Sequence, residues 1–220
     1  MKYLKFTVLL IPAMFAVLAW MGWGYMFRAA VATSCAVIVW LMAKQLTAGS
    51  KWYVIAALLL SIGGDWFLSH RRGIPVRFIY GVCLYFMAHA GFLCFCLKNG
   101  RLNRYVLIAL LTGFLVFFFV ALRPALSQPA LFISILAYLI VSCLSLAAAT
   151  GLRLPPPVRW CFSFGIALLV FSDTLIALNE FVGYKDLRFL IMPTYYAAHI
   201  FVTTALILSK KDDSQIVFTP

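Results

Sequence analysis

Charged residues are scarce in this chain of 220 residues, and acidic residues are the scarcest, since Asp and Glu together number six. Charged residues make up 11% of the chain and hydrophobic residues 65%, and the mean hydropathy is +1.02. A chain this apolar cannot bury its nonpolar surface inside one water-soluble globule. The composition therefore excludes an ordinary soluble protein, and no polar stretch is long enough for a separate soluble domain.

Several familiar motifs are missing as well. The six cysteines lie in apolar runs without the paired spacing of a zinc site, and the chain has no Gly-x-Ser-x-Gly elbow and no His-Glu-x-x-His helix. A serine hydrolase or zincin of known pattern is therefore not expected. The net charge of +12 comes from basic residues spread along the ends of apolar runs. This is typical of topology signals and lipid contacts, so neither nucleic acid, a metal nor a cofactor is predicted.

Apolar runs long enough to cross a hydrocarbon core of about 30 Å recur along the whole sequence. They predict an all-α membrane protein with eight transmembrane helices. The spans are expected at 6–23, 29–47, 53–69, 76–97, 105–122, 130–149, 160–180 and 189–208. The first run is interpreted as a span rather than a signal peptide, because no convincing small-residue cleavage site follows it. One transmembrane domain, 1–209, is expected to precede a polar tail, 210–220.

The distribution of basic residues predicts the orientation. Eight spans put both termini on one side of the membrane. If that side is cytoplasmic, eleven of the eighteen basic residues face the inside, whereas the cluster of Arg71, Arg72 and Arg77 faces outward. We therefore expect a multi-pass protein of a bacterial inner membrane with both termini in the cytoplasm.

The sequence contains an internal repeat. A basic residue followed by Trp precedes Asp65 and Asp173 by the same interval, and a Tyr-[Phe/Tyr]-x-Ala-His motif follows each aspartate. The repeated segments are 51–52 and 159–160, offset by 108 residues, and 85–89 and 195–199, offset by 110. Four spans per half is an even number. The halves, about 1–98 and 105–209, are therefore predicted to be parallel repeats related by an axis along the membrane normal.

Asp65 and Asp173 are the candidate catalytic residues. Each lies inside an apolar run, where a carboxylate costs about 2.5–3.5 kcal/mol to insert. A ligand-binding, proton-transfer or catalytic role is expected, and a structural hydrogen bond between helices is the alternative. The predicted axis would bring both aspartates, with His89 and His199, to one polar cavity. Two carboxyl groups in such a cavity ionise unequally, which favours one acid and one base.

Other residues are candidates for supporting roles around this cavity. The further candidates for its polar lining are Tyr195, Tyr196, Ser172 and Asn179. Lys44, at the end of the second span, is a candidate for binding a phosphate head group, although lysines at span ends commonly extend toward the membrane surface. The two aspartates and two histidines could also bind Zn²⁺, but their intervals of 24 and 26 residues match no compact metal motif.

The order of three segments resembles a known family. The Gly-Asp-x-x-Leu run at 64–68, the segment 171–181 and the Tyr-Tyr-Ala-Ala-His run at 195–199 are similar to the YhhN-like lysoplasmalogenases over nearly the full chain. The resemblance implies an ether hydrolase that cleaves the vinyl ether bond of a lysoplasmalogen. The products would be a fatty aldehyde and glycerophosphoethanolamine or glycerophosphocholine. The implied partners are the lysophospholipid, water and membrane lipids, with Asp65 and Asp173 as the acid and base.

Two other functions remain open at the level of sequence. A small proton-coupled transporter of a lipid or other small molecule would also use intramembrane carboxylates near a repeat axis. A non-catalytic lipid-binding or scaffold protein would leave the two aspartates without a task.

Overall fold

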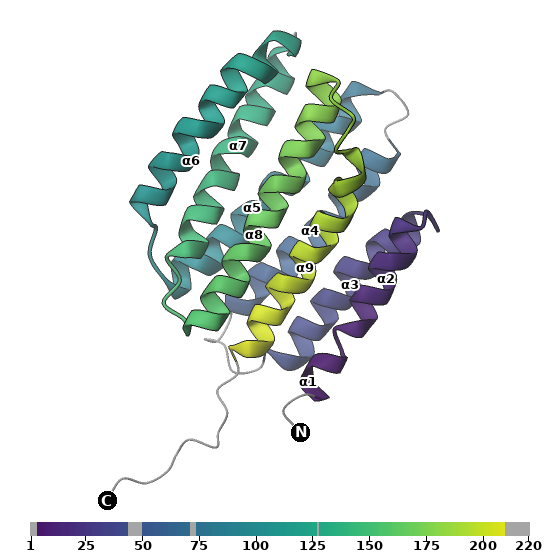
Figure 1. Ribbon diagram of the computed structural model, residues 1–220, viewed down its shortest axis with the longest axis vertical. Helices are drawn as coiled ribbons and strands as arrows, with labels where there is room; N and C mark the ends of the chain where they lie inside the picture. The colour runs from purple at the N-terminus through teal and green to yellow at the C-terminus, as the bar shows by residue number, and fades with distance from the viewer. Residues whose placement is uncertain (1–3, 44–49, 71–73, 127, 210–220) are drawn as a thin grey trace, which may run out of the picture.

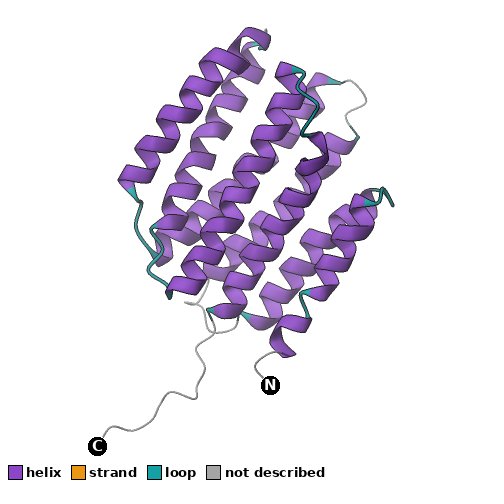
Figure 2. Cartoon of the chain, in the orientation of Figure 1, coloured by secondary structure: helices purple, strands orange, loops and turns teal. Residues whose placement is uncertain are grey.

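The computed structural model describes residues 4–43, 50–70, 74–126 and 128–209. Its described part is helical apart from loops and one isolated β-bridge (Figures 1 and 2). The α-helices are α1 Leu4–Thr7, α2 Leu10–Trp20, α3 Tyr25–Met42, α4 Ser50–Ser69, α5 Pro75–Asn99, α6 Arg104–Phe117, α7 Pro129–Thr150, α8 Pro156–Ala177 and α9 Ile191–Leu208. The remaining helical elements are short turns. They are the π turns Phe118–Leu122 and Leu178–Val182 and the 3₁₀ turns Arg123–Ala125 and Arg188–Leu190. Lys44 and the predicted tail 210–220 lie outside the described residues.

Seven helical segments of the described chain are long and apolar enough to cross a membrane. They are Tyr25–Met42, Ser50–Ser69, Val76–Asn99, Arg104–Ala125, Pro129–Thr150, Pro156–Val182 and Arg188–Leu208. Large apolar side chains face outward on several of them, including Met26, Tyr105, Ile108 and Val120, each more than half exposed. An apolar outer surface of this kind is stable in contact with the hydrocarbon chains of lipids. The length and surface of these helices mark a multi-pass membrane protein of the all-α class.

The first predicted span, 6–23, is shorter than expected. The chain forms one turn as α1 and then the 11-residue α2, which is too short to be counted with the seven. Pro12 explains the break, because proline has no N–H to donate and its ring crowds the carbonyl four residues earlier, at Val8. At the other end, α2 stops at Trp20, and Gly22 and Gly24, with positive φ angles of 87° and 101°, form the turn into α3.

The helices pack as neighbouring pairs within each half of the chain, and further contacts join the two halves. The most extensive contacts are those of α4 with α5 and of α8 with α9 (Figure 1). Across the halves, α5 packs on α7 and α9 packs on α3. The main buried core lies among these central helices, whereas α6 lies at the edge against α7 and contains no buried residue.

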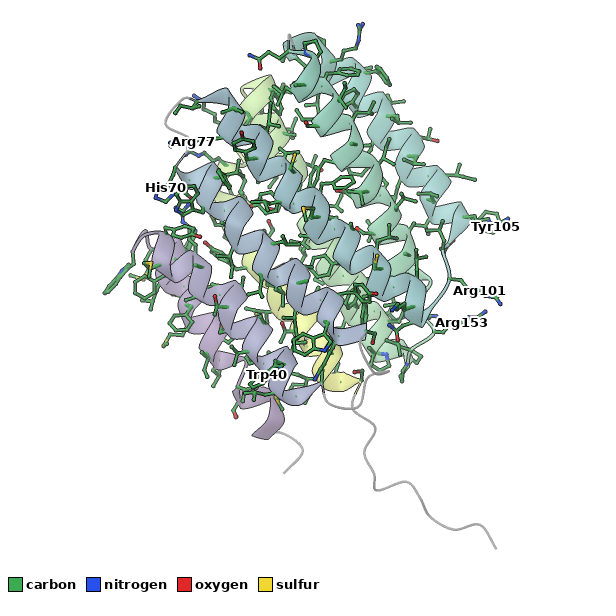
Figure 3. All side chains as sticks on the ribbon, turned by 180° about the vertical axis from the view of Figure 1, so that it is seen from behind. Trp40, His70, Arg77, Arg101, Tyr105 and Arg153 are labelled. Carbon is green, nitrogen blue, oxygen red and sulfur yellow. The ribbon has the colours of Figure 1, made fainter. Side chains whose placement is uncertain are left out.

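Both ends of the described chain, at α1 and at the end of α9, lie at the same end of the bundle (Figure 1). The start of α3, the end of α4 and the end of α8 lie at the opposite end. Basic side chains occur at both ends, with Arg77 at one and Arg101 and Arg153 at the other, as Figure 3 shows from behind.

Candidate active site

The carboxyl group of Asp65 receives two tyrosine hydroxyl groups. Asp65 lies on α4 with 9% of its surface exposed. The hydroxyl of Tyr85, on α5, donates to Asp65 Oδ1. The hydroxyl of Tyr195, on α9, donates to Asp65 Oδ2 at 3.1 Å. Both oxygens of this buried carboxyl are therefore bonded, and three helices fix its position.

Gly64 makes the contact between Asp65 and Tyr85 possible. A Cβ atom at Gly64 would lie 3.0–3.1 Å from three ring carbons of Tyr85, which is closer than ordinary van der Waals contact. The missing side chain lets the Tyr85 ring lie flat against α4 beside the aspartate. The close packing of Tyr85 against α4 thus explains why a glycine precedes Asp65 in the sequence.

The carboxyl group of Asp173 lies on α8 and is bonded from two other helices. Tyr138, on α7, donates its hydroxyl to Asp173 Oδ2 at 2.5 Å. His89 Nε2, on α5, lies 3.3 Å from the same oxygen. The side chain of Asp173 is 14% exposed, compared with 3% for His89.

Ser145 determines how the proton is held between His89 and Asp173. The Ser145 hydroxyl donates to the Ser142 carbonyl oxygen at 2.9 Å, and its own oxygen lies 2.8 Å from His89 Nδ1. With its hydrogen used in this way, Ser145 accepts from Nδ1–H. The other nitrogen of His89, Nε2, then shares one proton with Asp173, either as an imidazolium beside a carboxylate or as a neutral imidazole beside a carboxylic acid.

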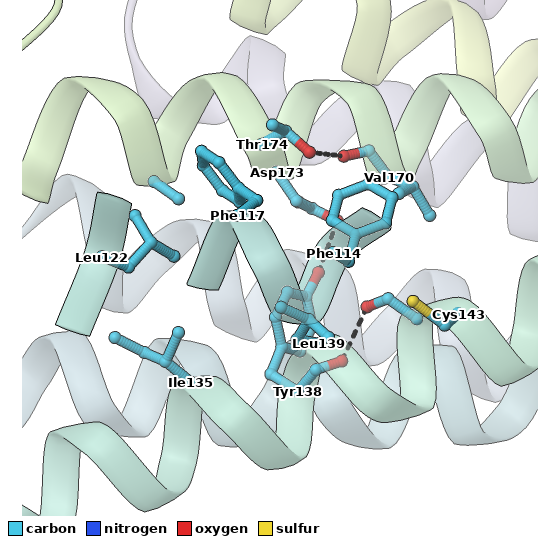
Figure 4. A pocket seen from close by; sticks show the side chains of 12 residues that line it. Phe114, Phe117, Leu122, Ile135, Tyr138, Leu139, Cys143, Val170, Asp173 and Thr174 are labelled. Carbon is cyan, nitrogen blue, oxygen red and sulfur yellow. Dashed lines mark hydrogen bonds between the residues drawn. The ribbon is translucent and has the colours of Figure 1, made fainter. Parts of the chain in front are cut away.

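The two aspartates face adjoining cavities of different character. Asp65 lines a cavity of about 280 Å³ that also contains Arg28, Glu180 and Arg188. Asp173 lines two apolar cavities of about 50 Å³ each, one of which is shown in Figure 4. Four side chains line both the polar cavity and the adjoining apolar one: Leu68, Phe78, Tyr85 and Ile176. The carboxyl groups therefore stand on either side of a boundary between polar and apolar space.

The second apolar cavity extends from Asp173 toward the edge of the bundle. Its walls come from α7, α8 and α6, and Phe114 and Phe117 of α6 lie close to Asp173 and Tyr138 (Figure 4). Because no residue of α6 is buried, this helix is a thin cover between the apolar cavity and the lipid-facing surface.

The structure separates two predicted residues from the aspartates. His199 Nδ1 lies 2.8 Å from the Tyr195 carbonyl oxygen, and its ring packs against the Tyr195 ring with centroids 4.4 Å apart. His199 therefore contacts Tyr195 and hydrogen-bonds neither aspartate. The Tyr196 side chain lines an apolar groove toward α2, where its buried hydroxyl has no partner in the described part of the chain. Tyr195 lines the cavity beside Asp65 whereas Tyr196 lines this groove, because consecutive residues of a helix point about 100° apart.

Two further predicted residues, Ser172 and Asn179, do line the polar cavity. Ser172 donates to the Ile191 carbonyl oxygen at 3.0 Å and thereby ties α8 to the start of α9. Asn179 Nδ2 donates to Glu180 Oε1 at 2.9 Å, within the π turn that extends α8. Their main contacts hold the cavity wall together.

Sequence reasoning missed the roles of four residues of the site. Tyr85 and Tyr138 bond to the carboxyl groups, Arg28 lines the cavity of Asp65, and Ser145 bonds to His89. Tyr85 has a sequence signal, because it occupies the repeat position of Tyr195. The other three have none, since an isolated Tyr, Ser or Arg in an apolar span does not reveal which helix it will face. Among the described residues, no group of three His, Cys, Asp or Glu side chains could hold a metal ion.

Comparison with known proteins places the chain in a family. The sequence model of the YhhN family matches residues 23–206. The chain belongs to the YhhN family. It is 28% identical over 172 residues to proteins named lysoplasmalogenase from Mycobacterium bovis and Mycobacterium tuberculosis. The alignment covers 72% of this YhhN chain and 62% of each relative, so the chain matches less than two thirds of their length. No solved structure matches it.

Proposed function

We propose that the protein is a lysoplasmalogenase that hydrolyses the vinyl ether bond of a lysoplasmalogen by acid–base catalysis between Asp65 and Asp173. The observation that supports the proposal most strongly is a pair of carboxyl groups, one buried and one partly buried, at the boundary between a polar and an apolar cavity. A single-chain ether lipid has the same boundary, with its alkenyl chain on one side and its glycerophospho group on the other. Membership of the YhhN family and the names of its relatives support the same reaction.

The reaction needs one proton donor and one group that activates water. A proton adds to the alkenyl carbon that does not carry the oxygen, and the double bond's electrons form the new C–H bond. Water then attacks the resulting oxocarbenium ion and loses a proton to a base, giving a hemiacetal. The C–O bond to glycerol then breaks as the hemiacetal hydroxyl loses its proton and the glycerol oxygen takes one up, which leaves a fatty aldehyde. One water is consumed and no oxidant or reductant is required.

We assign proton donation to Asp173 and water activation to Asp65, because of the cavities that each residue faces. Asp173 lines the apolar cavities, which suit the alkenyl chain and its reacting carbon. Asp65 lines the larger polar cavity, from which water can reach the oxocarbenium ion. The proton that Asp173 shares with His89 is the one donated to carbon. The pair must therefore regain one proton after each turnover, and the proton that Asp65 takes from the attacking water supplies it.

Hydroxyl donors keep both carboxyl groups in place during the reaction. Tyr85 and Tyr195 hold Asp65, and Tyr138 holds Asp173. Because these tyrosines come from α5, α9 and α7, the spacing between the carboxyl groups depends on the packing of the whole bundle. Rigid positioning of this kind is what acid–base catalysis at an isolated double bond requires.

We also propose that the helices form one eight-helix domain made of two parallel repeats, 1–98 and 105–209. The reciprocal packing of α5 on α7 and α9 on α3 supports a two-fold relation. So do the repeated cation–π contacts, in which Lys51 lies 5.7 Å from the Trp52 ring and Arg159 lies 5.3 Å from the Trp160 ring. With both termini in the cytoplasm, the polar cavity would open toward the outer side of a bacterial inner membrane.

The test is direct. The purified protein in detergent is incubated with a lysoplasmalogen, and free fatty aldehyde is measured. Aldehyde release by the wild-type protein is expected, whereas its absence would refute the enzymatic function. Protein in liposomes that accumulates the intact lipid without releasing aldehyde would instead support the transporter.

Incubation in D₂O tests the proposed order of steps. The aldehyde should carry one deuterium at C2, because the proton added to the alkenyl carbon comes from exchangeable groups. In H₂¹⁸O, the glycerophospho product should contain no ¹⁸O, since water attacks the alkenyl carbon. Label in its glycerol hydroxyl would contradict this mechanism.

A further inference from the structure

The polar cavity beside Asp65 carries charges of both signs at one end of the bundle. Arg28 comes from the first turn of α3 and Arg188 from the 3₁₀ turn before α9, and Glu180 comes from the π turn after α8. All three segments lie at the end opposite α1 (Figure 1). The proposed reaction at the vinyl ether uses none of these three side chains.

Arg28 lacks a full set of acceptors. Its guanidinium donates from Nη1 to Ser69 Oγ at 3.3 Å. Its Nε is buried and has no partner in the described chain. A buried N–H of a charged group without an acceptor is unfavourable, and its position in the cavity wall indicates that a ligand or water supplies the acceptor.

Arg188 adds a second guanidinium to the same cavity. Neither Arg28 nor Arg188 forms an ion pair with a carboxylate in the part of the chain that the structure describes. Arg28 interacts electrostatically with Asp65 across the cavity, but neither guanidinium has a described carboxylate within ion-pair distance, so the donors of both can reach an anion in the cavity. The planar fork of N–H donors on a guanidinium matches the oxygens of a phosphate group, to which it can donate two parallel hydrogen bonds.

The same cavity also carries the complementary charge. Glu180 accepts a hydrogen bond from Asn179 Nδ2, and both side chains line the cavity. A carboxylate in this cavity is suited to an ammonium group, as the arginines are suited to a phosphate. A cavity with both signs matches a zwitterion better than it matches a simple anion.

The cavity also continues toward the reacting atoms. Tyr85 and Phe78 line both this cavity and the apolar cavity that contains Asp173. A ligand whose phosphate lies at Arg28 and Arg188 can therefore extend past Asp65, and its chain can enter the apolar space beside Asp173. A lysophospholipid bound in this way lies with its head group in the polar cavity and its chain in the apolar cavity.

We propose that Arg28 and Arg188 bind the phosphate of a zwitterionic lysophospholipid head group, and that Glu180 faces its ammonium group. This inference rests on the proposed lysoplasmalogenase function and adds the residues that select a phosphate-bearing substrate. The head group then enters from the end of the bundle opposite α1, and the alkenyl chain points toward α6.

Binding of an inert substrate analogue tests the proposal without catalysis. The saturated 1-O-alkyl lysophosphatidylethanolamine has no vinyl ether, so its affinity for the full-length protein in detergent can be measured by calorimetry. Arg28→Gln and Arg188→Gln should each weaken binding about tenfold or more, because each removes charge-assisted hydrogen bonds. Arg101→Gln, at the other end of the bundle (Figure 3), is the matched control and should bind as the wild type does. Unchanged affinity in both cavity variants would overturn the proposal.

Hydrolysis of two substrates separates head-group recognition from a general defect. Arg28→Gln should raise KM for the lysoplasmalogen about tenfold with little change in kcat. With 1-O-alkenylglycerol, which has no phosphate, the variant and the wild type should have the same KM. An equal defect on both substrates would contradict phosphate recognition. Arg28→Lys, which keeps the charge, should recover part of the affinity and so exclude misfolding as the cause.

Competition identifies the source of the phosphate. Glycerophosphoethanolamine should displace the alkyl analogue at lower concentrations than inorganic phosphate, because it also presents an ammonium group. Equal displacement by inorganic phosphate would overturn the assignment to a lipid head group. If the wild type binds the analogue but hydrolyses no lysoplasmalogen, the proposed function fails while the head-group site stands. If it hydrolyses the lipid and the arginine variants bind normally, only the head-group site fails.

Discussion

Replacing Gly64 by Ala perturbs the candidate site without removing any polar group from it. The new Cβ would lie 3.0 Å from two ring carbons of Tyr85, so the ring must retreat by about 0.4 Å to reach the 3.4 Å of ordinary contact. The obstacle is a rigid aromatic ring between helices. Its hydroxyl, which donates to Asp65, must move with it.

The expected effect is larger on activity than on stability. Overpacking costs about 1–3 kcal/mol, but the gain in helix propensity from Gly to Ala returns about 1 kcal/mol. A displacement of this size at a positioned catalytic group should lower kcat about tenfold, since about 1 Å of misplacement can lower a rate a hundredfold. Aldehyde release and thermal unfolding in detergent measure the two effects on the same samples.

Two comparisons make this prediction sharp. Gly113 lies on α6, where an added Cβ meets nothing within 4 Å, so Gly113→Ala should keep full activity. In a Tyr85→Phe background the hydroxyl is already absent, and Gly64→Ala should reduce the rate little further. Wild-type activity in Gly64→Ala, or fully additive losses in the double variant, would refute the proposed role of this packing contact.

Three other substitutions test separate parts of the site. Tyr195→Phe removes a hydroxyl that donates to the Asp65 carboxyl group and should lower kcat about tenfold. Tyr196→Phe removes a buried hydroxyl that has no partner among the described residues and should leave the rate of aldehyde release unchanged. Val170→Phe adds bulk to the apolar cavity of about 50 Å³ shown in Figure 4. KM should therefore rise more for lysoplasmalogens with long alkenyl chains than for those with short ones. Equal increases at all chain lengths would contradict binding of the alkenyl chain in this cavity. Ser145→Ala frees Nδ1 of the neighbouring imidazole and should lower kcat about tenfold with KM unchanged, as steady-state kinetics would reveal.

The membrane class of the protein and its two aspartates were predictable from sequence, because both depend on simple solvation. A helix surface that faces lipid must be apolar along its length, and a carboxyl group in such a run is conspicuous. The same reasoning overestimated the first span. A hydropathy count does not include the effect of Pro12, which interrupts the backbone hydrogen bonds of the helix after the single turn of α1.

The partners of the aspartates were harder to predict, because they depend on which helices meet. The repeat suggested equivalent surroundings for Asp65 and Asp173, but the contacts differ. Tyr195 bonds to the aspartate of the other half, and His89 does the same, whereas His199 bonds to neither. A repeated motif indicates equivalent backbone positions, and each side chain then follows its own neighbours.

Removal of each carboxyl group tests the central claim most directly. Asp65→Asn and Asp173→Asn keep the size of the side chain and remove its acid–base function, and Asp186→Asn, in an exposed loop, is the matched control. Loss of a positioned acid or base typically lowers a rate about 10²–10⁴-fold. We predict that purified Asp65→Asn and Asp173→Asn release aldehyde from a lysoplasmalogen at least about 100-fold more slowly than the wild type, and that Asp186→Asn matches the wild type. Wild-type rates in both site variants would contradict the account.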